Sequence, residues 1–246
     1  MRKLFFASLL IAVSTLSLTA GCAKVKAGPV VTDKELVVLI HGLGRSNMAM
    51  WRLADRLEDA DYYVQRVGYR SLTRTPDQIV SEISTQINQC CLHHSNKVHF
   101  VGHSLGGLLI RSYLQNHDVE QLGNVVLIGT PNKGTTVVDE FRDHPLFGLF
   151  GPMTAALGTD KKNFPSRLTA PDYPVGIIAG YVKNDNPMIP GPNDGLVSVD
   201  STRLKNMTDF IEVEVGHSMM RYDENVAKYT INFLRNQVFV DSQITN

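Results

Sequence analysis

The sequence has no excess of charge of either sign, since 24 Lys and Arg residues balance 24 Asp and Glu residues. A protein that binds a phosphate backbone needs a basic surface, so nucleic acid is not an expected partner. Internal repeats of fixed period and long, biased polar stretches are also lacking, and 19 glycines and 11 prolines are ordinary numbers, which excludes collagen-like repeats and extensive disorder. The 246 residues, 43% of them hydrophobic, therefore predict one domain with a sizeable core.

Long uncharged runs are scarce, and the one that stands out lies at the N-terminus. Arg2 and Lys3 precede the uncharged run 4–18, and small residues follow it directly before Cys22. This order is typical of an export signal. The run is short for a helix that spans a bilayer, and no other segment comes closer, so we expect no transmembrane helix in the mature protein.

The segment around Cys22 resembles the lipobox of bacterial lipoproteins, in which the cysteine becomes the lipidated first residue. Thr19 stands where such motifs usually have Leu, Val or Ile. The resemblance implies a signal peptide at 1–21, lipidation of Cys22 and a tether at 22–34, which would anchor an exported protein to a membrane. Ala23 resembles the residue found after the cysteine in lipoproteins sent to the outer membrane, if the cell has one. A periplasmic or secreted protein without lipid is the alternative.

Cysteine is rare, with three in the chain, and two of them, Cys90 and Cys91, are adjacent. Because a disulfide between adjacent residues demands unusual geometry, we interpret the pair as half-buried thiols at a helix end. An exported protein meets an oxidising compartment, so a bridge between the two is the alternative. No CxxC or HxxxH spacing accompanies them, and neither a metal site nor a cofactor is expected.

Runs of β-branched residues alternate along the chain with segments that repeat apolar residues at helical spacing. This alternation predicts the α/β fold class, with a mostly parallel sheet flanked by helices. The strands are expected at 35–40, 62–69, 97–101, 124–128, 175–181 and 210–215, and the helices at 47–59, from Thr75 onward, at 105–116 and at 223–236.

The domain is expected to span 35–246, and one segment of it breaks the alternation. Residues from about 135 to 173 are rich in Gly, Pro and Phe and are too long for a simple connection. We interpret this segment as a small cap or lid inserted over the edge of the sheet. Its apolar stretch 146–157, with Phe150 and Met153, could line an acyl pocket or form ordinary core.

The segment Gly102-His103-Ser104-Leu105-Gly106 has the G-x-S-x-G pattern and lies between an expected strand and an expected helix. A serine at such a corner is held in a strained backbone conformation that exposes its hydroxyl, and the flanking glycines leave room for it. The helix that follows adds free N–H groups and partial positive charge. Ser104 is therefore predicted to be a nucleophile, the alternative being a serine that merely caps the helix.

With this motif in place, the chain resembles the α/β-hydrolase superfamily, and within it the bacterial lipases and esterases. The resemblance implies the α/β-hydrolase fold and acyl transfer through a Ser-His-Asp triad. It rests on a series of motifs in the expected order, namely His41-Gly-Leu-Gly44, Gly102-His-Ser-Leu-Gly-Gly107, Gly129-Thr-Pro-Asn-Lys-Gly134, Asn193-Asp-Gly-Leu-Val197 and Gly216-His217.

Eight histidines compete for the role of the base that a serine hydroxyl needs at neutral pH. His217 follows the last expected strand, where the superfamily order Ser…Asp…His requires the base. His103 is expected to point away from the chemistry, and His41 to have a structural role in the first loop.

The acid that would orient this base is predicted to be Asp194. It follows an expected strand, resembles the acid of the lipase motif D-G-L-V and agrees with the order of the triad. Asp185 and Asp200 are rivals nearby in the chain. An Asn-Asp-Gly turn without a catalytic role is the alternative.

By the same resemblance, the backbone N–H groups of Leu43 and Leu105 would form an oxyanion hole. Many secreted bacterial lipases carry an acidic calcium ligand two residues after the catalytic histidine, but Ser218 and Met219 follow here. We therefore expect no calcium site. Arg45 is interpreted as a loop cation rather than a catalytic group.

Together these features predict a serine hydrolase that cleaves carboxylic esters with a hydrophobic acyl chain. Lipase, lysophospholipase and short-chain esterase are not separated by these residues. An acyltransferase with the same triad is the alternative, because the acyl group can pass to an alcohol or lipid acceptor. A non-catalytic binding scaffold tethered to the membrane is a minor alternative, since such a scaffold has no need to keep a triad.

Overall fold

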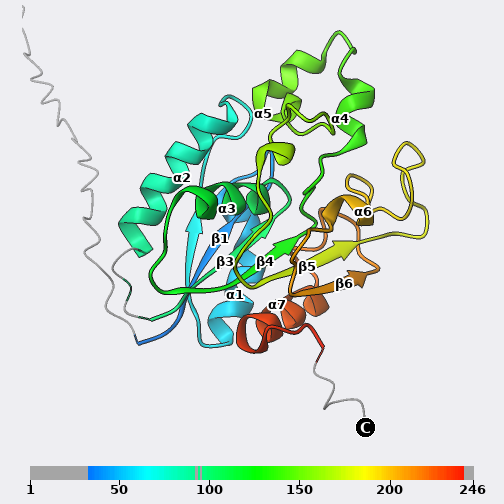
Figure 1. Ribbon diagram of the computed structural model, residues 1–246. Coiled ribbons are helices and arrows are strands. Elements are labelled where there is room, and N and C mark those ends of the chain that lie inside the picture. The colour runs from blue at the N-terminus through cyan, green and yellow to red at the C-terminus, as the bar shows by residue number, and fades with distance from the viewer. Residues whose placement is uncertain (1–32, 92–93, 95, 241–246) are drawn as a thin grey trace, which may run out of the picture. The chain divides into compact units, whose positions relative to one another are not determined.

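A computed structural model describes residues 33–91, 94 and 96–240 (Figure 1). The expected signal peptide and Cys22 lie outside the described residues. Within the described part, strands form one six-stranded sheet in the order β2-β1-β3-β4-β5-β6, and each neighbouring pair is parallel. The strands are β1 (Leu36–Ile40), β2 (Tyr63–Val67), β3 (Val98–His103), β4 (Leu122–Ile128), β5 (Val175–Gly180) and β6 (Asp209–Val213). The predicted α/β fold class is confirmed.

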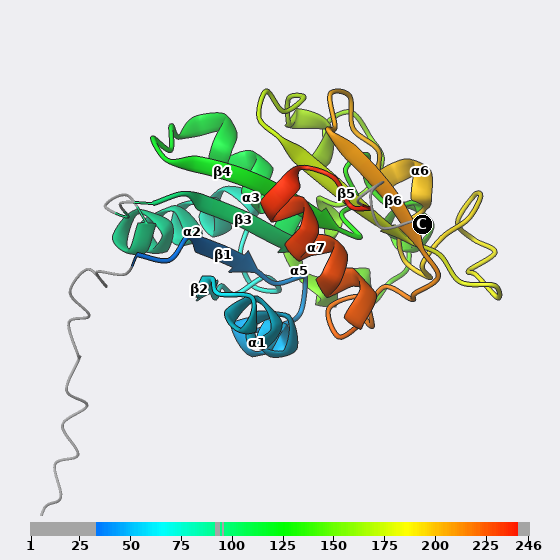
Figure 2. The ribbon, with the colours of Figure 1, turned by 90° about the horizontal axis from the view of Figure 1, so that it is seen from below.

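Helices cover both faces of this sheet (Figure 2). On one face pack α2 (Pro76–Cys91) and α3 (Leu105–Asn116), and on the other α1 (Trp51–Asp59), which follows η1 (Asn47–Met50), and α7 (Glu224–Asn236). In β1, Leu36, Val38 and Ile40 pack toward α2 and α3, whereas Val37 and Leu39 pack toward α1 and α7. A strand buried on both faces has no polar side, which explains its continuous apolar sequence. None of the described helices is both long and apolar enough to cross a membrane.

Helix α2 begins where its sequence predicts and ends at the paired cysteines. The hydroxyl of Thr75 accepts a hydrogen bond from the N–H of Gln78 at 3.4 Å, and the Gln78 side chain accepts one from the N–H of Thr75 at 3.0 Å. This reciprocal pair is a capping box. At the other end, Cys90 and Cys91 form a disulfide, so the interpretation as two free thiols is wrong and the alternative holds. Both belong to the last turn of α2.

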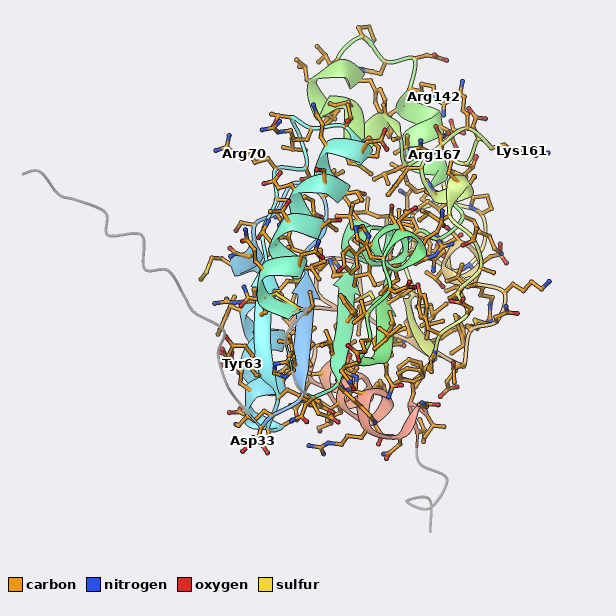
Figure 3. The ribbon with its side chains drawn as sticks, turned by 60° about the vertical axis from the view of Figure 1, so that its left-hand side comes forward. Asp33, Tyr63, Arg70, Arg142, Lys161 and Arg167 are labelled. Carbon is orange, nitrogen blue, oxygen red and sulfur yellow. A yellow bond between two sulfur atoms is a disulfide. The ribbon has the colours of Figure 1, made fainter. Side chains whose placement is uncertain are left out.

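The segment between β4 and β5 folds into short elements that the sequence pattern does not predict individually. They are α4 (Thr136–Phe141), η2 (Phe147–Phe150), α5 (Gly151–Ala155) and η3 (Pro165–Arg167). Figure 3 shows Arg142 and Arg167 of this segment at the end of the sheet opposite Asp33, which lies three residues before β1. The segment therefore lies toward the carboxyl ends of the strands. A further short helix, α6 (Val199–Thr202), precedes β6.

Candidate active site

The turn between β3 and α3 has the sharp geometry that G-x-S-x-G implies. Ser104 has a φ of 56°, a left-handed conformation that a residue other than glycine rarely adopts. A Cβ atom on Gly102 would collide with the backbone of Gly106 and Gly107, and one on Gly106 would collide with the backbone carbonyl of Ile40. The glycines therefore let α3 approach β1 and β3 closely, and the turn presents the Ser104 hydroxyl beyond the end of β3.

Ser104, His217 and Asp194, the predicted nucleophile, base and acid, meet in one chain of hydrogen bonds. Nε2 of His217 lies 2.9 Å from Oγ of Ser104, and Nδ1 of His217 lies 2.7 Å from Oδ2 of Asp194. An ionised carboxylate only accepts hydrogen bonds, so Nδ1 carries the proton and Nε2 is left to accept one from the serine hydroxyl. The N–H of His217 also donates to the backbone carbonyl of Asp194 at 2.9 Å, which ties the two loops together.

The carboxylate of Asp194 is held in place by its own loop. Its side chain is fully buried, and Oδ1 accepts hydrogen bonds from the N–H groups of Leu196 at 3.0 Å and Val197 at 2.8 Å. These bonds leave Oδ2 for the imidazole. Of the three candidate acids, Asp194 is the one that contacts His217, whereas Asp200 is 81% exposed and pairs with Lys133 at 3.1 Å.

The side chain of His103 packs against His217. The expectation that His103 points away from the chemistry is therefore wrong. Its ring centroid lies 4.9 Å from that of His217, and its Nε2 donates a hydrogen bond to the backbone carbonyl of His217 at 2.9 Å. Burial lowers the pKa of His103 well below its usual 6.5, and charge on His217 lowers it further. The ring is therefore neutral and supports the loop that carries His217. The sequence signal was its place directly before Ser104, but sequence does not give its direction.

The loop after β1 is fixed by a buried stack of rings. His41 lies parallel to Tyr69, with ring centroids 4.1 Å apart, and the Tyr69 hydroxyl donates to the carbonyl of His41 at 2.6 Å. Burial lowers the pKa of His41 and raises that of Tyr69, so both rings are neutral. The N–H of Gly44 donates to Oγ of Ser71 at 2.8 Å. His41 thus has a structural position, and its contacts hold the backbone on either side of Leu43.

The two backbone N–H groups predicted for an oxyanion hole are free in the described structure. Leu105 is the first residue of α3, where an N–H has no partner within the helix. Within the described residues, no acceptor is found for the N–H of Leu43, which lines the same cavity as Ser104. Both groups can therefore donate to an oxygen that develops negative charge beside Ser104.

A cavity of about 220 Å³ opens beside Ser104 and His217. Its apolar walls come from the loop after β4, from α4 and the cap, and from the loop of Asp194, through Pro131, Val137, Val138, Leu157, Leu196 and Val197. Of the apolar stretch 146–157, Leu157 and the polar Thr154 reach the cavity, while Met153 is buried in the core and Phe150 is 56% exposed. The stretch therefore divides between cavity wall, core and surface.

In the described part of the chain, no cluster of three or more His, Cys, Asp or Glu side chains could hold a metal ion. After His217, Met219 is 58% exposed and has no ligand atom of the kind that calcium binds. Independence from calcium stays a prediction.

The parallel sheet, the serine turn beyond β3 and the buried His–Asp pair are together the architecture of an α/β-hydrolase. The sequence model of the palmitoyl protein thioesterase family matches residues 36–174, more than half of the chain. The chain belongs to the palmitoyl protein thioesterase family. The match contains Ser104 and ends before Asp194 and His217. No curated protein matches the chain.

Solved structures have the same fold at low sequence identity. The mature lipase BlEst2 of Bacillus licheniformis is 18% identical, with a TM-score of 0.62 over 84% of this chain and 91% of the lipase. Phospholipase PlaB of Legionella pneumophila is 14% identical, with a TM-score of 0.62 over 84% of this chain and 60% of PlaB. An extracellular α/β-hydrolase from a Paenibacillus species is 17% identical, with a TM-score of 0.56 over 82% of this chain and 99% of the other.

Proposed function

We propose that this protein is a serine hydrolase that cleaves carboxylic esters or thioesters with an apolar acyl chain. One observation carries the proposal: the hydrogen-bonded chain of Ser104, His217 and Asp194 lies at the wall of a mainly apolar cavity. The family is named for a palmitoyl protein thioesterase, and the structural neighbours include a lipase and a phospholipase. Cleavage of a carboxylic ester or thioester is the chemistry that these names share.

In the first half of the reaction, the hydroxyl of Ser104 gives its proton to Nε2 of His217 as Oγ attacks the acyl carbonyl carbon. Asp194 accepts the Nδ1–H bond and stabilises the imidazolium without taking its proton. The N–H groups of Leu43 and Leu105 bind the resulting oxyanion, and each such donor typically contributes about 3–4 kcal/mol. His217 then passes its proton to the leaving alcohol or thiol, and an acyl-enzyme remains.

In the second half, water replaces the leaving group. It gives a proton to Nε2 of His217 while its oxygen attacks the acyl carbon, and the acid is released as Ser104 recovers its proton. An alcohol in place of this water would yield a new ester, which is the acyltransferase alternative. Nothing in the described part of the chain assigns an acceptor site, so we propose hydrolysis.

The size of the cavity bears on the acyl chain. At about 220 Å³ it is smaller than pockets of about 300–1,000 Å³ that enclose most drug-sized ligands. We therefore expect kcat/KM to be highest for short and medium acyl chains. Val137, Val138 and Leu157 would contact the chain, because they form the apolar wall beside Ser104.

Active-site labelling followed by a substrate series tests the function. Protein lacking residues 1–21 is treated with a fluorophosphonate probe, and Ser104→Ala is the control. We expect the parent protein alone to be labelled, and to hydrolyse p-nitrophenyl esters and matched thioesters with a maximum below the palmitoyl chain. A folded parent protein that takes no label and cleaves no ester would instead be the tethered scaffold. Transfer of the acyl group to added alcohol in preference to water would identify an acyltransferase.

We also propose export and lipid anchoring through Cys22, on the basis of the N-terminal sequence. The full-length chain and Cys22→Ser are expressed in a bacterium, the cells are fractionated, and the N-terminal peptide is analysed by mass spectrometry. The parent protein is expected in the membrane fraction with a lipid mass on Cys22. Equal distribution of both proteins, with unmodified Cys22, would show that the chain is not a lipoprotein.

A further inference from the structure

A largely buried arginine lies beside the proposed catalytic residues. Arg221 is four positions after His217, lines the cavity and is 6% exposed. Its Nε is fully buried and has no hydrogen-bond partner within the described residues. The guanidinium lies 4.7 Å from the ring centroid of its neighbour Tyr222, and no ion pair with a described carboxylate accompanies this contact.

A buried polar group without a hydrogen-bond partner is costly, because it loses its hydration and gains no bond in return. At Arg221 this group is the Nε–H. Proteins tolerate such costs at functional sites, where a ligand can supply the missing partner. A second cation, Arg45, also lines the cavity, and no Asp or Glu is among the lining residues. Positive charge at both residues lowers the pKa of buried His103, which packs against His217. The field of the two arginines thus reaches the reacting groups.

The position of Arg221 in the chain suggests that it faces the leaving group of the substrate rather than the acyl chain. The leaving group lies against His217, because Nε2 returns the proton to it. Arg221 comes from the same loop as His217, whereas the apolar Val137, Val138 and Leu157 come from α4 and the cap. An apolar acyl chain fits the wall of the cap, and a charged leaving group fits the loop of His217.

We infer that Arg221, assisted by Arg45, forms a subsite for an oxyanion, a carboxylate or a phosphate, carried by the leaving group of the ester. This inference rests on the proposed function and adds the chemical class of the substrate. A guanidinium binds either oxyanion through paired, charge-assisted hydrogen bonds, and such bonds are stronger than those between neutral groups. The substrate is thus an ester with an apolar acyl part and an anionic alcohol or thiol part.

Matched substrates test this charge preference with little change in size. The carboxylate pair is the butyryl ester of 4-hydroxyphenylacetate and that of its neutral amide. The phosphate pair is 4-(phosphonooxy)phenyl butyrate and the neutral 4-(methylsulfonyloxy)phenyl butyrate, whose substituent has the same number of heavy atoms. The measured quantity is the ratio of kcat/KM for the anionic ester to that for the neutral ester. In the parent protein we expect a ratio of at least about 10 in one pair or both, and the larger ratio identifies the oxyanion.

Variants assign this preference to the guanidinium. Arg221→Met should lower the ratio to about 1, a decrease of at least about 10-fold, Arg221→Lys should retain part of the preference, and Arg45→Met should lower the ratio by less. Arg52→Met makes the same chemical change on the exposed surface of α1, outside this cavity, and should leave the ratio unaltered. Melting temperatures report folding. If Arg221→Met does not fold, the ratios of the parent protein and of Arg221→Lys still test whether Arg221 binds the oxyanion.

The outcomes separate this inference from the proposed function. Ratios near 1 in the parent protein, or ratios that Arg221→Met and Arg221→Lys leave unaltered, overturn the oxyanion subsite while ester hydrolysis stands. A preference for an anionic acyl group, measured with p-nitrophenyl hemisuccinate against p-nitrophenyl butyrate, overturns its placement on the leaving-group side. If no ester is cleaved beyond the rate of Ser104→Ala, the proposed function itself fails.

Discussion

Nε2 of His103 donates a hydrogen bond to the backbone carbonyl of His217 at 2.9 Å. The residue before the proposed nucleophile therefore supports the loop of the proposed base, although the two histidines are 114 positions apart. His217 is consequently held at two points. Asp194 contacts Nδ1 of its ring, and His103 contacts its backbone carbonyl. This arrangement makes His103 a positioning residue.

Removal of the His103 donor should misplace the base without removing it. We expect His103→Ala to lower kcat by about 10- to 100-fold with a smaller effect on KM, because an error of about 1 Å in a catalytic group can cost about 100-fold. His103→Gln should recover part of this loss, since its amide N–H can also donate. Steady-state kinetics of both variants on one butyryl ester checks the prediction. Equal losses in the two variants would contradict a role for the hydrogen bond.

Replacement of the nucleophile should abolish turnover and leave the fold intact. Ser104→Ala is expected to lower ester hydrolysis by at least about 1,000-fold, since only the oxyanion hole and substrate binding remain. The melting temperature should not fall, because the substitution creates no cavity in the core and removes no core contact. Hydrolysis of p-nitrophenyl butyrate at the parent rate by this variant would show that Ser104 is not the nucleophile.

The acid is tested by a change that keeps the loop and removes the charge. Asp194→Asn offers the wrong hydrogen-bonding partner to Nδ1 of His217, so kcat should fall by about 10,000-fold with little change in stability. Asp185→Asn and Asp200→Asn are matched controls and should each cost less than about 10-fold. If Asp200→Asn lowered kcat much more than Asp194→Asn, the assignment of Asp194 as the acid would be wrong.

Stability should decrease as the pH falls below about 6.5. Burial lowers the pKa values of His41, His99 and His103 in the folded state, while the unfolded chain has the usual value of 6.5. Below this pH the unfolded state binds protons that the folded state does not, so the free energy of unfolding falls by up to about 1.4 kcal/mol per pH unit for each histidine. Above about pH 7.5 this contribution is complete.

Urea unfolding at pH 7.5, 6.5 and 5.5 measures this dependence. His103→Gln, which has no titrating ring, should show a shallower decrease over this range than the parent protein. His144→Gln is the control, since His144 is exposed on the cap. A pH dependence that is the same in all three proteins would contradict the assignment to His103.

Activity and melting temperature should be indifferent to EDTA and to added calcium. Within the described residues no cluster of ligands is suited to a metal ion, and exposed Met219 stands where many lipases have an acidic ligand. A ligand that binds the folded state must raise its stability. Thermal unfolding with and without calcium checks this, and a reproducible calcium-dependent rise in melting temperature would contradict it.

The fold and the sharp turn at Ser104 could be predicted from sequence because their signals are local. The apolar run of β1 identifies a strand buried on both faces, and the glycines flanking Ser104 identify a sharp turn between strand and helix. Each signal depends on backbone propensity and contacts within a few residues. The short helices of the cap escaped prediction because four- to six-residue elements have no clear period and are stabilised mainly by packing.

The sequence by itself determined the α/β class, the place of Ser104 and the order in which an acid and a base must follow. Tertiary structure alone decided that Asp194 rather than Asp200 contacts His217, that His103 faces His217, and that Nε of Arg221 is buried without a partner among the described residues. The physical reason is sequence distance. Side chains more than 20 positions apart meet through the packing of separate loops at the carboxyl ends of the strands, and no local preference of the chain specifies which of them will touch.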